Sequence, residues 1–481
     1  MSTVPQRMLS SNGIDAATGA PLLCATLEQI AALACGEQSP TGESEELRRY
    51  AAALREDHLD TRFQIDPRDL AESGWGVILP EGREAELREA LAPLLALRKS
   101  QAGRLRESRY RELAGYRGES KARFLARHGQ GPGPADPDLL PYYLLLAADP
   151  AEISFRFQYQ LDVQYAVGRL CFATLDEYAR YAEGVVAAER ESHARARRVC
   201  FFGTANPDDP NTASSLQNLV APLAASVSNN RPDWPVDTVF GPAATKAALC
   251  ERMGGALTPS LLFTASHGLG FPPADPRHAL YQGALLCQDW PGPKAGRGPI
   301  PEDHYLAGHD IADSASPAGL ISFHFACYSA GTPLHDSFTK EGTEQKKIAT
   351  ESFVAHLPQR LLGHPRGGAL AVVGHVDRAW TFSFDWPEAG AHIQVFESAL
   401  GRLLDGYPVG AAMEYFNQRY AELYTDLLEE REEVQWGAEP DFLSLADLWT
   451  AANDARSYVV LGDPAVRLTT GSTLANPLAD P

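Results

Sequence analysis

From residue 199 onward, short segments that are apolar along their whole length alternate with segments of helical pattern. Strands without polar alternation are buried on both faces, which is typical of a parallel sheet covered by helices on each side. The alternation therefore constrains the fold to the α/β class and predicts a mostly parallel, six-stranded sheet. The expected strands span residues 199–202, 238–240, 260–264, 319–325, 368–373 and 457–461, and the expected helices span residues 212–226, 243–253, 350–362, 392–404 and 408–429.

The chain has 481 residues, which exceeds what one ordinary core organises, so we expect more than one domain. The first part has a polar start followed by two stretches of helical pattern, at 27–33 and 44–55. The expected parts are an N-terminal helical, regulatory segment (1–60), a smaller α/β subdomain (61–192), the main α/β domain (193–470) and a flexible tail (471–481).

The predicted smaller subdomain mixes apolar and charged segments. Residues 75–79 and 142–146 are strand candidates, and residues 174–191 predict a helix with Thr174 at its N-cap. The charged run 104–127 predicts a solvated helix face.

Charge and cysteine content exclude several classes of protein. The formal net charge of −20 would repel nucleic acid and anionic lipid, so we expect neither nucleic acid nor a membrane as partner. Seven scattered cysteines indicate free thiols in a reducing compartment rather than a disulfide framework. The N-terminus leads into no apolar signal core, and no run reaches membrane-spanning length. We therefore expect a cytoplasmic protein.

Two of the expected strands end on reactive side chains. His267 follows the strand at 260–264, and Cys327 follows the strand at 319–325. Ligands of parallel sheets bind beyond the carboxyl ends of the strands, where both residues are expected. A lone cysteine is more often an inert buried thiol, but a thiol beside an imidazole is the minimum set for a cysteine nucleophile. The backbone amides of Gly268 and Cys327 are the candidate donors to an oxyanion.

Four motifs carry a resemblance to a known group of enzymes. The segment from Phe263 to Gly268 (Phe-Thr-Ala-Ser-His-Gly) and the segment from Phe323 to Cys327 (Phe-His-Phe-Ala-Cys) resemble the histidine and nucleophile motifs of caspase–hemoglobinase-type cysteine peptidases. The gingipain-like family is the closest of these. The segment 368–374 followed by Trp380, and the Gly-Asp-Pro at 462–464, are similar to its pocket strand and its closing strand.

The resemblance covers roughly residues 140 to 470 and implies fold and activity together. It implies a caspase-like three-layer α/β/α sandwich with a mostly parallel six-stranded sheet, preceded by a smaller α/β subdomain. It also implies a cysteine endopeptidase with a Cys-His dyad, in which Trp380 forms a wall of the substrate pocket. Ser266, His375 and Asp377 are further pocket candidates because they lie at the same strand ends.

The sequence departs from the gingipain-like pattern in two places. The sequence does not identify the residue that orients the histidine. Asn206, Asp208 and Asp209 are all candidates, and they lie in the loop after the first strand of the main domain. No carboxylate stands near 212–215, where arginine-specific members have one to bind a basic side chain. The preferred residue before the scissile bond therefore stays open.

The composite interpretation is a cysteine endopeptidase that acts on protein or peptide substrates and is held inactive until triggered. A regulatory partner and a covering or cleaved loop at 332–350 are the candidate restraints. We expect no cofactor and no metal, because the histidine-containing turns at 302–304 and 309–310 fit no standard zinc motif and no phosphate-binding loop is present. The alternatives are a catalytically inactive protease-like scaffold that binds peptides or partners, and a Cys-His acyl transferase.

Overall fold

One ten-stranded sheet runs through the protein. The computed structural model describes residues 8–22, 24–36, 65–190, 195–341, 344–386 and 390–469. The strand order across the sheet is β5-β4-β6-β7-β22-β19-β14-β10-β8-β9. The strands are β4 (Trp75–Pro80), β5 (Tyr110–Gly115), β6 (Tyr143–Ala147), β7 (Ala166–Leu170), β8 (Val199–Gly203), β9 (Val236–Phe240), β10 (Leu261–Ala265), β14 (Ile321–Phe325), β19 (Ala371–His375) and β22 (Tyr458–Gly462).

The predicted fold class is confirmed. All neighbouring strands of this sheet are parallel except β19 and β22, which are antiparallel. The six strands from residues 193–470 are adjacent, in the order β22-β19-β14-β10-β8-β9. Every residue of β10 and β14 is buried, so both faces of the sheet are covered, as expected for continuous apolar strands.

The four strands from residues 75–170 extend the same sheet rather than forming a second one. They join through β22, which is last in sequence but central in the sheet. Asp463, directly after β22, is fully buried and accepts hydrogen bonds from Trp75 Nε1 (2.9 Å) and Arg98 Nε (2.7 Å). The sheet thus crosses the boundary expected at 192/193, and the division into two domains stays a prediction.

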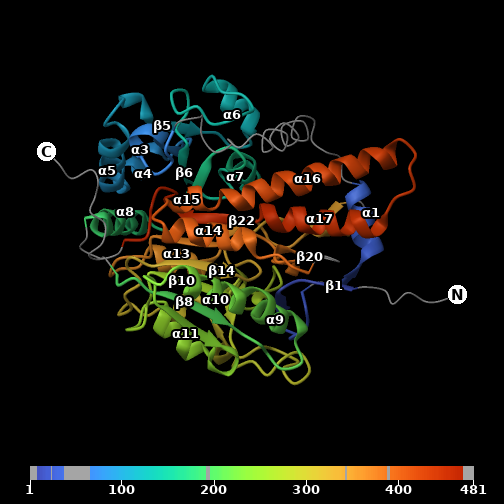
Figure 1. The fold of residues 1–481 in the computed structure, drawn as a ribbon. Helices are drawn as coiled ribbons and strands as arrows, with labels where there is room; N and C mark the ends of the chain where they lie inside the picture. Colours follow the sequence, from blue (N-terminus) through green and yellow to red (C-terminus); the bar gives the residue numbers. More distant parts are fainter. Residues whose placement is uncertain are drawn as a thin grey trace.

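Helices lie between the strands along most of the chain (Figure 1). An aromatic cluster that includes Phe263, Phe323 and Phe396 joins β10, β14 and α14. The main helices are α4 (Glu84–Ala90), α5 (Ala92–Ala102), α8 (Leu175–Glu189), α10 (Ala221–Asn230), α11 (Lys246–Arg252), α13 (His356–Leu362), α14 (Gln394–Leu404), α16 (Glu414–Gln435) and α17 (Phe442–Arg456). Among these described helices, none has the length and apolar character that a membrane span requires.

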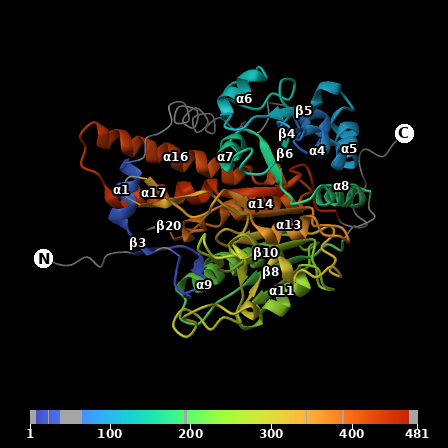
Figure 2. The same ribbon diagram turned by 180° about the vertical axis from the view of Figure 1, so that it is seen from behind.

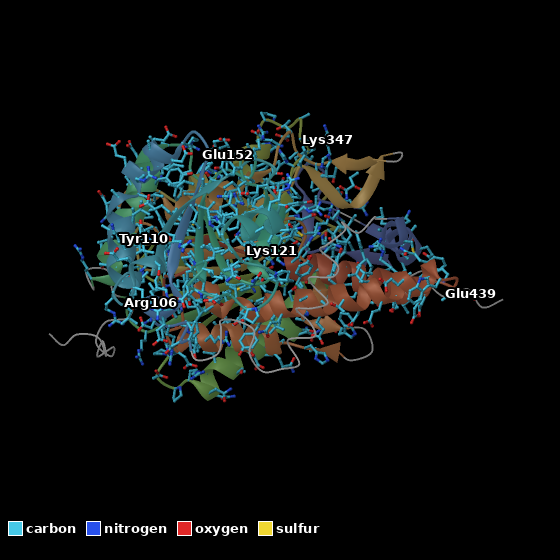
Figure 3. All side chains as sticks on the ribbon, turned by 90° about the horizontal axis from the view of Figure 1, so that it is seen from above. Arg106, Tyr110, Lys121, Glu152, Lys347 and Glu439 are labelled. Atoms are coloured by element: carbon cyan, nitrogen blue, oxygen red, sulfur yellow. The ribbon has the colours of Figure 1, made fainter. Side chains whose placement is uncertain are left out.

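Two elements differ from the sequence-based expectation. The charged run 104–127 is not one solvated helix, because it contains strand β5 and the short helix α6 (Lys121–Arg127). Tyr110 of β5 lies at one side of the molecule in Figure 3, at the edge of the sheet, where charged side chains are tolerated. Helix α17 was not predicted. The helix expected at 44–55 and the tail 471–481 lie outside the described residues.

The N-terminal segment lies against the main domain. It contains β1 (Met8–Ser10), β2 (Gly13–Asp15), β3 (Cys24–Thr26) and α1 (Leu27–Gly36), which confirms the helix expected at 27–33. Helix α1 packs beside α17, and both views show the blue chain continuing past β1 and β3 toward α9 (Pro210–Ser214) (Figures 1 and 2).

Strand β2 enters a small second sheet. Its order is β13-β12-β11-β2, with β11 (Gly268–Gly270), β12 (Leu285–Leu286) and β13 (Tyr305–Leu306). Because β11 begins directly after His267, the N-terminal segment passes the carboxyl ends of the main strands.

A hairpin follows the nucleophile candidate. It consists of β16 (His335–Glu341) and β17 (Glu344–Lys347), and Figure 3 shows it at the rim of the molecule, labelled at Lys347. Its base is fixed by a buried ion pair in which Arg378 donates to both carboxylate oxygens of Asp336, at 2.7 and 2.9 Å.

Candidate active site

His267 and Cys327 occupy equivalent positions on neighbouring strands. Strands β10 and β14 are paired in parallel from Leu261↔Ile321 to Ala265↔Phe325. Each reactive residue therefore stands two positions beyond the last pair, at the same edge of the sheet. Both side chains are buried. The structure thus brings together the two residues that the strand ends predicted.

Asp209 is the residue that contacts the imidazole. Its Oδ2 hydrogen-bonds to His267 Nε2, and it also accepts from Thr212 Oγ1 (3.0 Å) and, through Oδ1, from the backbone N–H of Asn211 (3.1 Å). Burial raises the pKa of Asp209, but the charge and hydrogen bond of His267 and the other donors outweigh this and lower it. An ionised carboxylate at Nε2 leaves Nδ1 of His267, which has no hydrogen-bond partner among the described residues, for proton transfer.

The other two orienter candidates have different partners. Asn206 donates from Nδ2 to the carbonyl oxygens of Cys287 (3.0 Å) and Trp290 (2.9 Å), which holds the loop in place. Asp208 is exposed and pairs with Lys294 at 2.8 Å. It has φ = 58°, and this left-handed residue turns the chain so that the next side chain, Asp209, points inward.

The Cys327 thiol sits in a sharply turned backbone. Its Sγ accepts a hydrogen bond from the Ala379 N–H at 3.2 Å. The next residue, Tyr328, has φ = 58° and donates its N–H to the carbonyl oxygen of Asp377 at 2.7 Å, and Asp377 itself has φ = 80°. Burial raises the pKa of Cys327 to about 12, so the thiol is neutral in this arrangement.

The two amides expected at an oxyanion converge on one carbonyl oxygen. The N–H groups of Gly268 and Cys327 both donate to the backbone oxygen of Asn12, at 3.2 and 3.4 Å. A Cβ at position 268 would lie 1.8 Å from the carbonyl oxygen of Cys327, so only glycine permits this approach. The pair has the convergent geometry that stabilises a carbonyl oxygen as it gains charge.

Asn12 is a site residue that sequence reasoning missed. Its backbone N–H donates to Ala379 O at 2.8 Å, and its side-chain Nδ2 donates to Ser266 O at 2.8 Å. The Asn-Gly dipeptide at 12–13 signals a turn, and nothing in that signal links it to residues 254 or more positions away.

Of the four pocket candidates, Ser266 and Trp380 lie at or next to residues that contact Asn12, whereas His375 and Asp377 have other partners. Ser266 contacts Asn12 through its carbonyl oxygen, and Trp380 follows Ala379, although its ring packs on Phe338 with centroids 4.7 Å apart. The His375 ring packs on Tyr458, 4.1 Å between centroids, and burial lowers its pKa to about 3.

Asp377, the last of these candidates, lies beside Arg378, to which it is joined at 3.3 Å. Burial is the main cause that raises its pKa to about 6. Within the described ranges, no three His, Cys, Asp or Glu side chains gather as metal ligands would.

No model of a protein family matches the sequence, and no curated protein does. Among solved structures, the chain resembles one described only as a protease, with 12% identity and a TM-score of 0.48, over 87% of this chain and 82% of that one. It also resembles the Arg-specific cysteine proteinase gingipain R, with 11% identity and a TM-score of 0.45, over 83% of this chain and 79% of that one.

A further neighbour is separase of Saccharomyces cerevisiae in complex with securin, with 10% identity and a TM-score of 0.32, over 67% of this chain and 16% of that one. A gingipain, the kind of protein that the sequence motifs resemble, is thus among the solved structures that the chain resembles. At these identities the likeness concerns the fold alone, so the site has to be interpreted from its own geometry.

Proposed function

We propose that the chain is a cysteine endopeptidase with Cys327 as nucleophile and His267 as proton carrier. The observation that carries the proposal is the convergence of the Gly268 and Cys327 amides on a peptide carbonyl oxygen, next to a thiol and an imidazole at matching strand positions. A site of this kind binds a peptide bond and supplies donors for its oxyanion.

In the proposed mechanism, the residue before the scissile bond lies where Asn12 lies. Its N–H donates to Ala379 O, and its carbonyl oxygen accepts from the amides of Gly268 and Cys327. The sulfur of Cys327 bonds to the carbonyl carbon, and the two amides stabilise the resulting oxyanion. His267 carries the proton to the leaving amine, and Asp209 holds the ring. Water then hydrolyses the thioester and restores the thiol.

The inactive-scaffold alternative rested on the lack of a clear acidic partner for the histidine. Asp209 removes that argument, because it is buried, hydrogen-bonded to Nε2 and has a lowered pKa. The acyl-transferase alternative has no supporting observation among the described residues.

A cleavage profile on a peptide library tests the proposal, together with labelling by a peptidyl acyloxymethyl ketone. We expect cleavage and labelling with the wild-type chain and with Cys35→Ala, which removes an exposed thiol. Both should be lost in Cys327→Ala. Labelling that persists in Cys327→Ala would refute Cys327 as the reactive thiol. A wild-type chain that neither cleaves nor reacts would favour the scaffold.

We also propose that the enzyme is restrained until a trigger acts, with the 332–350 segment as one candidate restraint. The base of its hairpin is held by the buried Asp336–Arg378 pair and by the bond from Leu334 N to Ser352 Oγ (3.0 Å). Fully active enzyme with this segment intact by mass spectrometry would refute cleavage there as the trigger.

A further inference from the structure

The candidate site is occupied by the protein's own N-terminal segment. Residues 11–15 lie between β11 and Ala379, and residues 16–22 turn back beside them. Leu22 donates its N–H to Gly13 O at 3.0 Å, and Asp15 donates to Ala20 O at 2.8 Å, so the segment forms a small hairpin of its own. The occupant is therefore held in a defined register.

Asn12 is bound through its backbone and its side chain. Ala379 O accepts its backbone N–H, and the amides of Gly268 and Cys327 donate to its carbonyl oxygen. Ser266 O accepts its carboxamide nitrogen at 2.8 Å, and the residue is only 1% exposed. These are the contacts that the proposed mechanism assigns to the residue before a scissile bond.

Gly13 lies directly beside the sulfur. A Cβ at position 13 would be 2.8 Å from Cys327 Sγ, so only glycine lets the chain pass this close without displacing the thiol or Leu22. Beyond it, β2 pairs with β11 in the register Gly13↔Gly268 to Asp15↔Gly270. The chain is thus bound on both sides of the Asn12–Gly13 peptide bond.

We propose that Cys327 cleaves the Asn12–Gly13 bond of its own chain, and that the site accepts asparagine as the residue before the scissile bond. The proposal rests on the proposed function. The sulfur–carbon bond to Asn12 forms as the carbon–nitrogen bond to Gly13 breaks, and the thiol proton passes through His267 to the Gly13 nitrogen. One water then hydrolyses the thioester, which leaves a carboxylate on Asn12, an amine on Gly13 and a free thiol.

The chemistry of the pocket favours a neutral carboxamide. The group that meets the side chain is a backbone carbonyl oxygen, which accepts a hydrogen bond from an amide N–H but repels a carboxylate. Asparagine-containing peptides are therefore the expected substrate class.

The test follows the N-terminus of the full chain by intact mass and N-terminal sequencing during incubation. We expect the wild-type chain to begin at Gly13, either as isolated or after incubation, and Cys327→Ala to keep the residues before it. Asn12→Asp should be cut about tenfold more slowly or not at all, since it loses the donor and adds charge. Asn229→Asp, an exposed asparagine on α10, is the matched control and should be cut as wild type.

Mixing wild-type protein with tagged Cys327→Ala shows whether cleavage is intramolecular, and the tagged chain should stay intact. Self-cleavage is refuted by a wild-type chain that stays intact, by equal cutting of Cys327→Ala or Asn12→Asp, or by cutting of the tagged chain. An intact wild-type chain whose Cys327 still reacts with the ketone probe leaves the proposed peptidase standing. An intact chain with no labelling and no peptide cleavage refutes both proposals.

Discussion

Asp209→Asn tests whether the proposed catalytic histidine depends on the carboxylate that the structure places at its Nε2. The variant removes the charge from a buried partner but keeps a side chain that caps α9 well. Hydrogen bonds to charged groups contribute about 1.5–3 kcal/mol, and about 1.4 kcal/mol corresponds to a factor of ten in rate. We therefore expect kcat/KM to fall about 10- to 150-fold.

The assay is hydrolysis of the best peptide from the cleavage profile, with the melting temperature measured in parallel. Asp208→Asn is the matched control, because the neighbouring carboxylate is exposed and pairs only with Lys294 among the described residues. Its kcat/KM should stay within about twofold of wild type, since exposed ion pairs contribute little. An Asp209→Asn enzyme as active as wild type, or an equal loss in Asp208→Asn, would refute the assignment of the orienter.

Three further variants test the structure around the site. In Gly268→Ala the new Cβ would lie 1.8 Å from the carbonyl oxygen of Cys327, so the rate of peptide hydrolysis should fall at least about 100-fold. Gly131→Ala is the control, because the space around Gly131 is open, and it should leave that rate unchanged. Arg378→Met leaves the buried carboxylate of Asp336 without its cation and should lower the free energy of unfolding, measured in urea, by about 3–5 kcal/mol. Arg231→Met, which breaks the more exposed pair with Asp405, should lower it by less than about 1 kcal/mol. Equal losses in the two variants would contradict this prediction. Burial raises the pKa of Asp454 to about 7, so between about pH 4 and 7 the folded state keeps a proton that the unfolded state lacks, and stability falls as pH rises. Asp454→Asn should remove up to about 1.4 kcal/mol per pH unit of that slope, and parallel slopes for the two proteins would refute the protonated carboxyl.

The sequence was sufficient to predict that His267 and Cys327 stand at matching strand ends because of a simple geometric rule. Paired residues on parallel strands share a register, and here residues 60 positions apart are opposite each other from Leu261↔Ile321 onward. Two apolar strands that each end two residues before a reactive side chain therefore place those side chains together. The six-stranded part of the sheet was predictable for the same reason, since each strand carries its own apolar signal.

Residue types alone did not show that Asp209, rather than Asn206 or Asp208, contacts His267. Three polar side chains lie within four positions of one loop, and each is able to accept a hydrogen bond from an imidazole. The backbone decides between them: the left-handed turn at Asp208 and the N-cap of α9 aim Asp209 at His267, while Asn206 is turned toward the carbonyls of Cys287 and Trp290. Such dihedral choices follow from tertiary packing rather than from local pattern.

Strands β5 and β2 escaped prediction because they form through pairing with strands distant in sequence. Strand β5 is an edge strand in which Arg111 is half-buried and Glu112 is exposed, so its charged residues resemble a solvated helix. Strand β2 has only three residues, and its partner β11 lies more than 250 positions away. Neither segment carries an apolar period long enough to predict its structure.

The N-terminal segment covers Cys327, and this changes how the burial of the thiol is interpreted. A fully buried cysteine is usually an inert packing residue, and the raised pKa of this thiol is consistent with that interpretation. However, Gly13 passes so close that a Cβ there would lie 2.8 Å from the sulfur, and Asn12 O occupies the two amides beside it. Both residues belong to the segment that occupies the substrate position of the proposed mechanism. The N-terminal segment therefore contributes to the burial of Cys327, and this burial agrees with the proposed nucleophile.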